Sequence, residues 1–220
     1  LSLRAGEQVR MNLSYMKSNV KLVAIGSGVS MGYLGNSHFG LEDLSIINSM
    51  PNILIINPCD CFEVYKTVKA LSTYQGPAYL RLTGAAGNPI VHEKDYEFNL
   101  GKYSILKDGK DILIIAYGSM CSISLNAAKE LEEINSIDSC VVNLHTLRPI
   151  DPDLVNLLKK FNQIFVIEEH SEVGGLNSII SSLILKENIK PNIYKSLSLP
   201  PKYLTSGSYE ELLTEYNLNK

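Results

Sequence analysis

Residues 20–58 read VKLVAIGSGVSMGYLGNSHFGLEDLSIINSMPNILIINP, and this stretch decides the fold. Two apolar runs rich in β-branched residues, at 20–27 and 53–58, enclose a glycine-rich loop and a segment of helical periodicity at 41–50. Apolar runs that alternate with helical segments are typical of parallel strands covered by helices on both faces. The stretch therefore predicts a strand, a glycine-rich loop, a helix and a second strand of an α/β sheet.

The same alternation continues outward along the chain. Further strands are expected at 76–82, 103–109, 111–119, 139–147, 163–170 and 193–197. Further helices are expected at 3–16, 61–72, 122–135, 152–161, 175–187 and 209–216. Gly, Pro, Asn and charged residues without periodicity fill 84–100, which indicates a crossing loop. We therefore predict an α/β fold of two consecutive doubly wound sheets, with domains at 1–90 and 103–220 joined by a linker at 91–102.

Length, charge and composition exclude several classes of function. The 220 residues are 45% hydrophobic and carry a formal net charge of -3 without a basic stripe, so nucleic acid is not expected as a partner. No apolar run approaches the roughly 20 residues that span a bilayer, and the first residues lack the pattern of a secretory signal. No membrane association and a cytoplasmic location are expected. Because the sequence starts with Leu1 in what resembles the middle of an element, we expect further residues upstream.

The four cysteines give no metal-binding pattern. Cys59 and Cys61 flank one aspartate, Cys121 and Cys140 are distant, and no C-x-x-C pair is present. Reduced structural thiols are favoured over a metal site or a disulfide. No metal ligands are therefore predicted.

The loop at 26–43 is the richest candidate site. Its five glycines permit positive φ and close backbone approach, and ligands commonly bind at the carboxyl ends of parallel strands. It lacks the G-K-[ST] of a P-loop and the third glycine of a dinucleotide fingerprint. His38 could hold a substrate hydroxyl or stabilise a developing oxyanion, and it could equally be a loop histidine bonded to backbone.

Several motifs then resemble the transketolase family. The loop reads G-x-G-x-x-x-G-x-L-G-x-S-H-x-x-x-E-D, R-A-x-E-Q-V-R precedes it at 4–10, and S-M-P-N-I follows it at 49–53. A P-x-D-x-x-E motif comes next. The second half carries L-R-P-I-D at 147–151 and E-E-H at 168–170, followed by G-G-L. The motifs fall in the family's order across nearly the whole chain, which is more specific than any one of them.

This resemblance implies a pyrimidine-binding domain that is incomplete at its start, followed by a transketolase C-terminal domain. It implies the carboxy-terminal part, or a subunit, of a thiamine-diphosphate enzyme that moves a two-carbon ketol unit between sugar phosphates. The glutamate that activates the cofactor and the aromatic residues that stack on its pyrimidine are expected upstream of Leu1, and Glu7 does not match that glutamate. The cofactor-binding residues are therefore unknown.

The diphosphate and Mg²⁺ site belongs to another domain, on the same chain or on a separate subunit. The chain alone is therefore expected neither to bind thiamine diphosphate nor to turn over. A homodimer or a heterotetramer is expected by analogy.

Two residues of this sequence match residues that contact the substrate in the family. His38 matches the histidine that contacts sugar hydroxyls, and Arg81 matches the arginine that binds the substrate phosphate, although a structural ion pair is the alternative for Arg81. Leu34 stands where many transketolases have an acid, and Gly26 where they often have a histidine. The donor and acceptor sugars are therefore not determined.

Three other functions remain open: a 1-deoxyxylulose-5-phosphate synthase, the β-subunit of a 2-oxoacid dehydrogenase (E1 beta), and a non-catalytic dimerisation module. Glu42 and Asp43 favour transketolase over the synthase.

The E-E-H motif at 168–170 could supply a carboxylate pair for acid–base catalysis, but neighbours on a strand face opposite ways and packing is favoured. A tight turn at Gly174 and Gly175 is favoured over an anion site. Arg148 is expected to anchor a loop.

Overall fold

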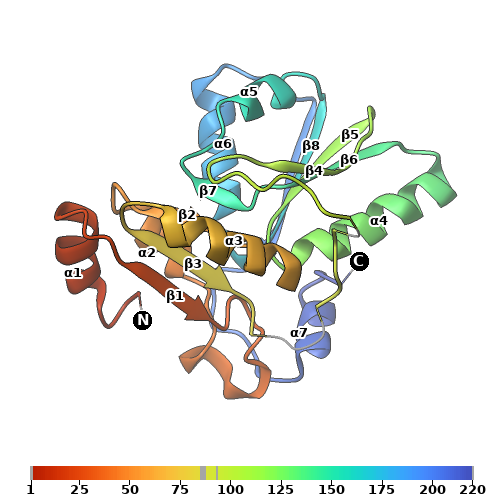
Figure 1. Cartoon of the computed structure of the whole chain (residues 1–220). Coiled ribbons are helices and arrows are strands. Elements are labelled where there is room, and N and C mark those ends of the chain that lie inside the picture. The colour runs from red at the N-terminus through yellow and green to blue at the C-terminus, as the bar shows by residue number, and fades with distance from the viewer. Residues whose placement is uncertain (1, 85–87, 93, 220) are drawn as a thin grey trace.

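A computed structural model describes residues 2–84, 88–92 and 94–219, and Figure 1 shows two sheets with helices around them. The first sheet has the order β1 (Lys21–Ile25), β3 (Ala78–Leu82), β2 (Leu54–Ile56) and β7 (Thr146–Arg148). The first three strands are parallel, and β7 is antiparallel to β2.

The second sheet has five strands. In sheet order they are β4 (Ser104–Lys107), β6 (Ser139–Asn143), β5 (Ile112–Ala116), β8 (Gln163–Ser171) and β9 (Ile193–Leu199). All pairings are parallel except that of the edge strand β4 with β6. The predicted α/β class with two sheets in series is confirmed, with one antiparallel strand in each sheet that the sequence did not indicate.

The strand predicted over 139–147 is wrong in its second half. The backbone leaves the second sheet after Asn143, where Leu144 N–H donates to Ala116 O and Asn57 N–H donates to His145 O, both at 2.8 Å. The chain then joins the first sheet as β7, beside β2. Since β7 follows the predicted linker in sequence but lies in the first sheet, the domain division at 91–102 stays a prediction.

The predicted helices are present, with shifted ends. They are α1 (Gly6–Gln8), α2 (Asp43–Asn48), α3 (Cys61–Thr73), α4 (Met120–Asn135), α5 (Asp153–Leu158), α6 (Leu176–Lys186) and α7 (Tyr209–Glu215). The first predicted helix is π-helical over Val9–Tyr15, and an unpredicted 3₁₀ segment spans Gly32–Ser37. Asp60 caps α3 by accepting from Glu63 N–H at 2.7 Å, which satisfies a donor that the helix cannot use itself.

One apolar cluster of the core spans both sheets. Every residue of β2, β5 and β6 is buried, as the continuous apolar runs indicate for central strands. Ile55 and Tyr79 of the first sheet belong to the same apolar cluster as Leu113 and Val166 of the second. The irregular stretch predicted at 84–100 contains no helix or strand in its described residues, and residues 85–87 and 93 lie outside them.

Candidate functional site

The loop between β1 and α2 closes on itself and packs against β8. Gly28 and Gly40 exchange backbone hydrogen bonds of 2.9 and 3.0 Å, which pin the two ends of the loop together. Gly28 has φ +62°, and a Cβ there would lie 2.2 Å from Glu169 Oε1. Only glycine fits such a backbone and such a close approach. These contacts therefore hold the loop in one conformation.

His38 lies at the exposed end of this loop. Its backbone N–H donates to Gly35 O at 2.9 Å, and its ring Nδ1 lies 2.9 Å from Ser37 Oγ. The residue lines a cavity of about 560 Å³ that β1, the loop and β3 surround, together with Glu42 and Arg81. The structure thus places the predicted histidine beside a cavity large enough for a small polar substrate.

Arg81 lies at the inner wall of the same cavity and is only 1% exposed. Its Nε donates to Asp43 Oδ2 at 2.8 Å, and its Nη2 donates to Gly40 O at 2.8 Å and Glu169 O at 3.3 Å. With the Asn57 amide oriented to suit its neighbours, Nη1 donates to Asn57 at 2.9 Å. Every guanidinium nitrogen therefore has a protein acceptor.

Asp43 completes this buried ion pair. Tyr79 OH also donates to Asp43 Oδ2, at 2.7 Å. Burial raises the pKa of Asp43, but the Arg81 charge and its hydrogen bonds outweigh burial and leave that pKa below its usual range. The structure describes Arg81 as an ion-pair partner, and its binding of a substrate phosphate stays a prediction.

The two adjacent glutamates of β8, Glu168 and Glu169, form hydrogen bonds with different elements of the fold. Glu169 accepts from Val29 N–H at 2.7 Å, from Ser119 Oγ at 2.7 Å and from Tyr209 OH at 2.8 Å. It therefore joins the candidate loop to α4 and α7. Sequence reasoning missed this role, because the partners lie 40 to 140 residues away and no local motif marks them.

Glu168 instead caps α6. It accepts from Leu176 N–H at 2.6 Å and from Asn177 N–H at 2.9 Å, so the first N–H groups of that helix already hold a carboxylate. A Cβ on Gly175 would lie 2.1 Å from Glu168 Oε2. The predicted tight turn, and the separation of the two glutamates onto opposite faces, are confirmed.

Burial shifts the pKa values of Glu168 and His170 in opposite directions. It raises the pKa of Glu168 to about 7, although the hydrogen bonds of α6 and the Arg81 charge act in the opposite direction. Burial and the Arg81 charge lower the pKa of His170 to about 4, so the imidazole is neutral near pH 7. The region therefore holds an uncharged histidine next to a carboxyl group that titrates near neutrality.

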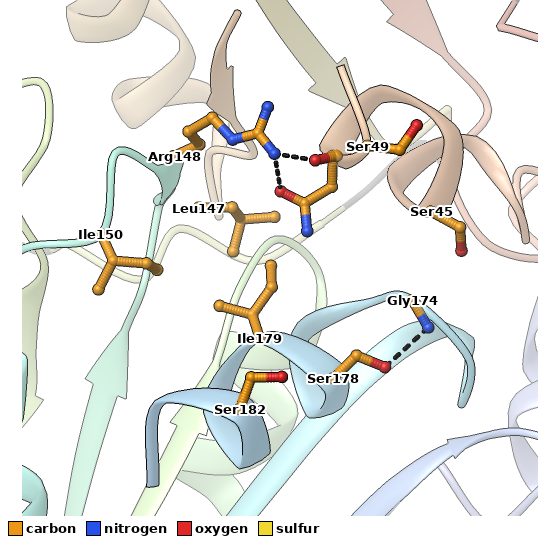
Figure 2. A pocket seen from close by; sticks show the side chains of 10 residues that line it. Ser45, Ser49, Leu147, Arg148, Ile150, Gly174, Ser178, Ile179 and Ser182 are labelled. Carbon is orange, nitrogen blue, oxygen red and sulfur yellow. Dashed lines mark hydrogen bonds between the residues drawn. The ribbon is translucent and has the colours of Figure 1, made fainter. Parts of the chain in front are cut away.

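A second cavity, of about 570 Å³, lies between α2 and α6 (Figure 2). Arg148 at its rim donates to Asn48 O, to Asn48 Oδ1 at 2.6 Å and to Met50 O. These acceptors belong to the end of α2 and the turn after it, so the prediction that Arg148 anchors a loop is confirmed. Ser45, Ser178 and other small side chains line the rest, and no charged group faces the cavity except Arg148 among the described lining residues.

The structure is that of an α/β protein with a cavity at the carboxyl end of a parallel strand, which is the candidate ligand site. The pyrimidine binding domain of transketolase matches residues 1–88, and the transketolase C-terminal domain matches residues 101–220. The chain belongs to the transketolase family.

Three individual proteins are similar to nearly the whole of this chain. One of the subunits of the apulose-4-phosphate transketolase of Phocaeicola vulgatus is 33% identical over 218 residues, which cover 99% of this chain and 69% of that protein. A putative transketolase family protein of Sinorhizobium fredii is 32% identical, and the chain covers 63% of its length. A solved structure described as a split gene transketolase, an inactive β4 tetramer, matches 98% of this chain and 68% of its own with a TM-score of 0.87 and 32% identity. The chain thus spans about two thirds of the length of each of these three proteins.

Proposed function

We propose that this chain is the carboxy-terminal part, or one of the two kinds of subunit, of a transketolase that moves a two-carbon ketol unit between sugar phosphates, and that it is inactive alone. The similarity over 98% of the chain to a split gene transketolase carries this proposal. The relative named as a subunit of a transketolase supports it. The cytoplasmic location expected from the sequence stays a prediction; no helix among the described residues is long and apolar enough to cross a membrane.

His38 is the residue proposed to contact the substrate. The exposed ring at the cavity edge can donate to, or accept from, a sugar hydroxyl without first breaking a buried contact. Arg81 would stabilise the cavity wall through Asp43, and its guanidinium would reach a phosphate only after giving up one of its protein acceptors. We therefore assign sugar recognition to His38 first and keep phosphate binding by Arg81 as a prediction.

The described residues fit thiamine diphosphate only in part. The cofactor's pyrimidine needs a carboxylate free to bond a ring nitrogen, whereas Asp43 in this cavity is held by Arg81 and Tyr79. Glu42 is exposed. No buried and unpaired carboxylate lines the cavity among the described residues. We propose that another domain or subunit supplies this carboxylate together with the diphosphate and Mg²⁺ site.

The test is ketol transfer measured with this chain alone and with the diphosphate-binding segment or chain that accompanies it. The proposal expects transfer from a ketose phosphate to an aldose phosphate only in the combined sample. Condensation of pyruvate with an aldose phosphate would instead support the synthase. Absence of both activities, in a combined sample that binds thiamine diphosphate, would favour the dimerisation module.

A further inference from the structure

Three potential metal ligands meet at the start of α3, away from the cavity beside His38, and a second buried thiol lies in the same apolar cluster as one of them. The Cys59 Sγ, a Glu63 carboxylate oxygen and a His92 ring nitrogen all lie within 4.8 Å of one another. Cys121, in the first turn of α4, belongs to the same buried apolar cluster as Cys59. These four residues are called the Cys59 cluster below.

The cluster is buried, and one of its polar atoms lacks a partner. Cys59 is 2% exposed, and Glu63 and Cys121 are each 0% exposed. The His92 side chain is 10% exposed, and its Nε2 faces Glu63 Oε1 at 3.6 Å without a hydrogen bond. A buried ring nitrogen that makes no hydrogen bond costs free energy that a bound cation would recover.

Surrounding groups hold the ligands in place. Glu63 accepts from Cys59 N–H at 2.7 Å, from Asn143 Nδ2 at 2.9 Å and from Tyr96 OH at 2.8 Å. The His92 ring stacks on Tyr96 with centroids 3.7 Å apart. Hydrogen bonds of this kind orient ligands in metal sites and tune their affinity. The Cys59 cluster is therefore largely fixed before any ion arrives.

We propose that Cys59, Glu63 and His92, with Cys121 as the fourth donor, form a tetrahedral site for Zn²⁺. Two sulfurs, an imidazole and a carboxylate are the donors that Zn²⁺ accepts, at about 2.0–2.3 Å, whereas hard cations prefer oxygen alone. Ligand atoms around such an ion lie roughly 3.3–3.8 Å apart, so Cys59, Glu63 and His92 must contract by about 1 Å and the Cys121 side chain must turn toward them. A cavity of about 310 Å³ lined by Pro58, Cys59 and Asp60 gives the ion an entry path.

The arrangement of the donors supports the same ion, because the Glu63 carboxylate and the His92 ring already face each other at 3.6 Å. Zn²⁺ would displace a proton from each thiol and any proton on the His92 Nε2, and those protons would leave to solvent. The bound ion would join α3, α4 and the 88–92 segment, which ties the predicted linker to both sheets.

This metal site could not be predicted from the sequence, because its ligands come from three separate segments. Only Cys59 and Glu63 are local neighbours, at the turn before α3 and in its first turn. No C-x-x-C spacing links the cysteines. The expectation of structural thiols without a metal is what this proposal revises.

Metal binding by the full protein in which this chain occurs tests the proposal. After chelator treatment under a thiol-free reductant, the protein should take up one Zn²⁺ at the cluster, with a Kd below about 1 μM. Co²⁺ in its place should give the thiolate charge-transfer absorption and the intense visible bands of tetrahedral sulfur ligation, which needs no variant. Cys59→Ser and His92→Gln should each weaken binding by at least about 100-fold.

Matched controls separate this site from other thiols. Cys61→Ser changes the exposed cysteine two residues away, and Cys140→Ser changes a buried cysteine outside the cluster. Both should bind Zn²⁺ as the unsubstituted protein does. Equal losses in Cys61→Ser and Cys59→Ser, a cobalt spectrum without a thiolate band, or no Zn²⁺ uptake at micromolar concentration would each overturn the proposal.

Discussion

The Val29 backbone N–H donates to Glu169 Oε1 at 2.7 Å, across 140 residues of sequence. This bond fixes the candidate loop to the end of β8, and Gly28 beside it has no side chain because Glu169 occupies that space. The shape of the loop that carries His38 thus depends on a residue of the second sheet.

Substitution Gly28→Ala should destabilise the protein. The added Cβ would lie 2.2 Å from Glu169 Oε1, on a backbone with φ +62°. Overpacking and the left-handed conformation together should lower the free energy of unfolding by about 2–4 kcal/mol, measured by urea denaturation. Gly6→Ala is the control, because nothing lies within 4 Å of a Cβ there, and it should be neutral or slightly stabilising. Equal stability of the two variants would contradict the packing of the loop on Glu169.

Substitution Asp43→Asn should be strongly destabilising, because it leaves the Arg81 charge buried without its partner. Loss of one member of such a pair costs about 3–5 kcal/mol. Asp95→Asn is the control, since Asp95 pairs with Lys66 at a surface position and its side chain is 84% exposed. Removal of that pair should give no measurable change. A small effect of Asp43→Asn would mean that the ion pair contributes little to stability, so that Arg81 could exchange Asp43 for a substrate phosphate at little cost.

Substitution His38→Ala should impair activity without changing stability, because the residue is exposed and, among the described residues, its ring forms a hydrogen bond only with Ser37. Loss of a hydrogen bond to substrate should lower kcat/KM of the complete enzyme by about 10- to 100-fold. Tyr33→Phe tests specificity, since Tyr33 is 76% exposed and lies outside the lining of the cavity. An equal loss in both variants would mean that the loop acts through its shape alone.

The strands and most helices could be predicted from the sequence because their signals are local. A short continuous apolar run such as Ile112–Ala116, rich in β-branched residues, is typical of a central strand, and every residue in it is buried. Asp60 and Glu63 mark the start of α3 three residues apart, which is the spacing of a capping residue. These features need no information from distant parts of the chain.

The remaining features depend on contacts between distant residues. Thr146–Arg148 pairs with β2, about 90 residues earlier, and no local pattern shows that a strand will change sheets. Arg81 and Asp43 are 38 residues apart, so an ion pair and a free phosphate ligand look the same in sequence. The family resemblance identified His38, but its cavity exists only after β1 and β3 pair.

Thiamine diphosphate with Mg²⁺ should not raise the melting temperature of this chain alone. A ligand that binds the native state stabilises it by mass action, but the cavity beside His38 has no buried and unpaired carboxylate among its described residues. Differential scanning fluorimetry with and without the cofactor measures this directly. A shift of several degrees would show that these residues suffice for binding, and the proposed sharing of the cofactor site would fail.

Stability should depend on pH through Glu168. Its pKa is about 7 in the folded protein, above the 4.5 of an ordinary glutamate, because burial disfavours the charged form. The folded state therefore binds the proton more tightly, so the stability that Glu168 contributes is full below about pH 4.5 and is lost as the pH rises through 7. A change of one in pKa corresponds to about 1.4 kcal/mol, and the expected loss is on the order of 3 kcal/mol.

Glu168→Gln removes this titration, so the comparison is between the unsubstituted protein and the variant at each pH. Between pH 5 and 8 the free energy of unfolding of the unsubstituted protein should fall relative to that of the variant, because only the unsubstituted protein must ionise a buried carboxyl group. Glu172→Gln, at an exposed position on the following turn, should show a constant difference. A difference for Glu168→Gln that stays constant over the same range would mean that the α6 N–H groups keep this carboxylate charged throughout.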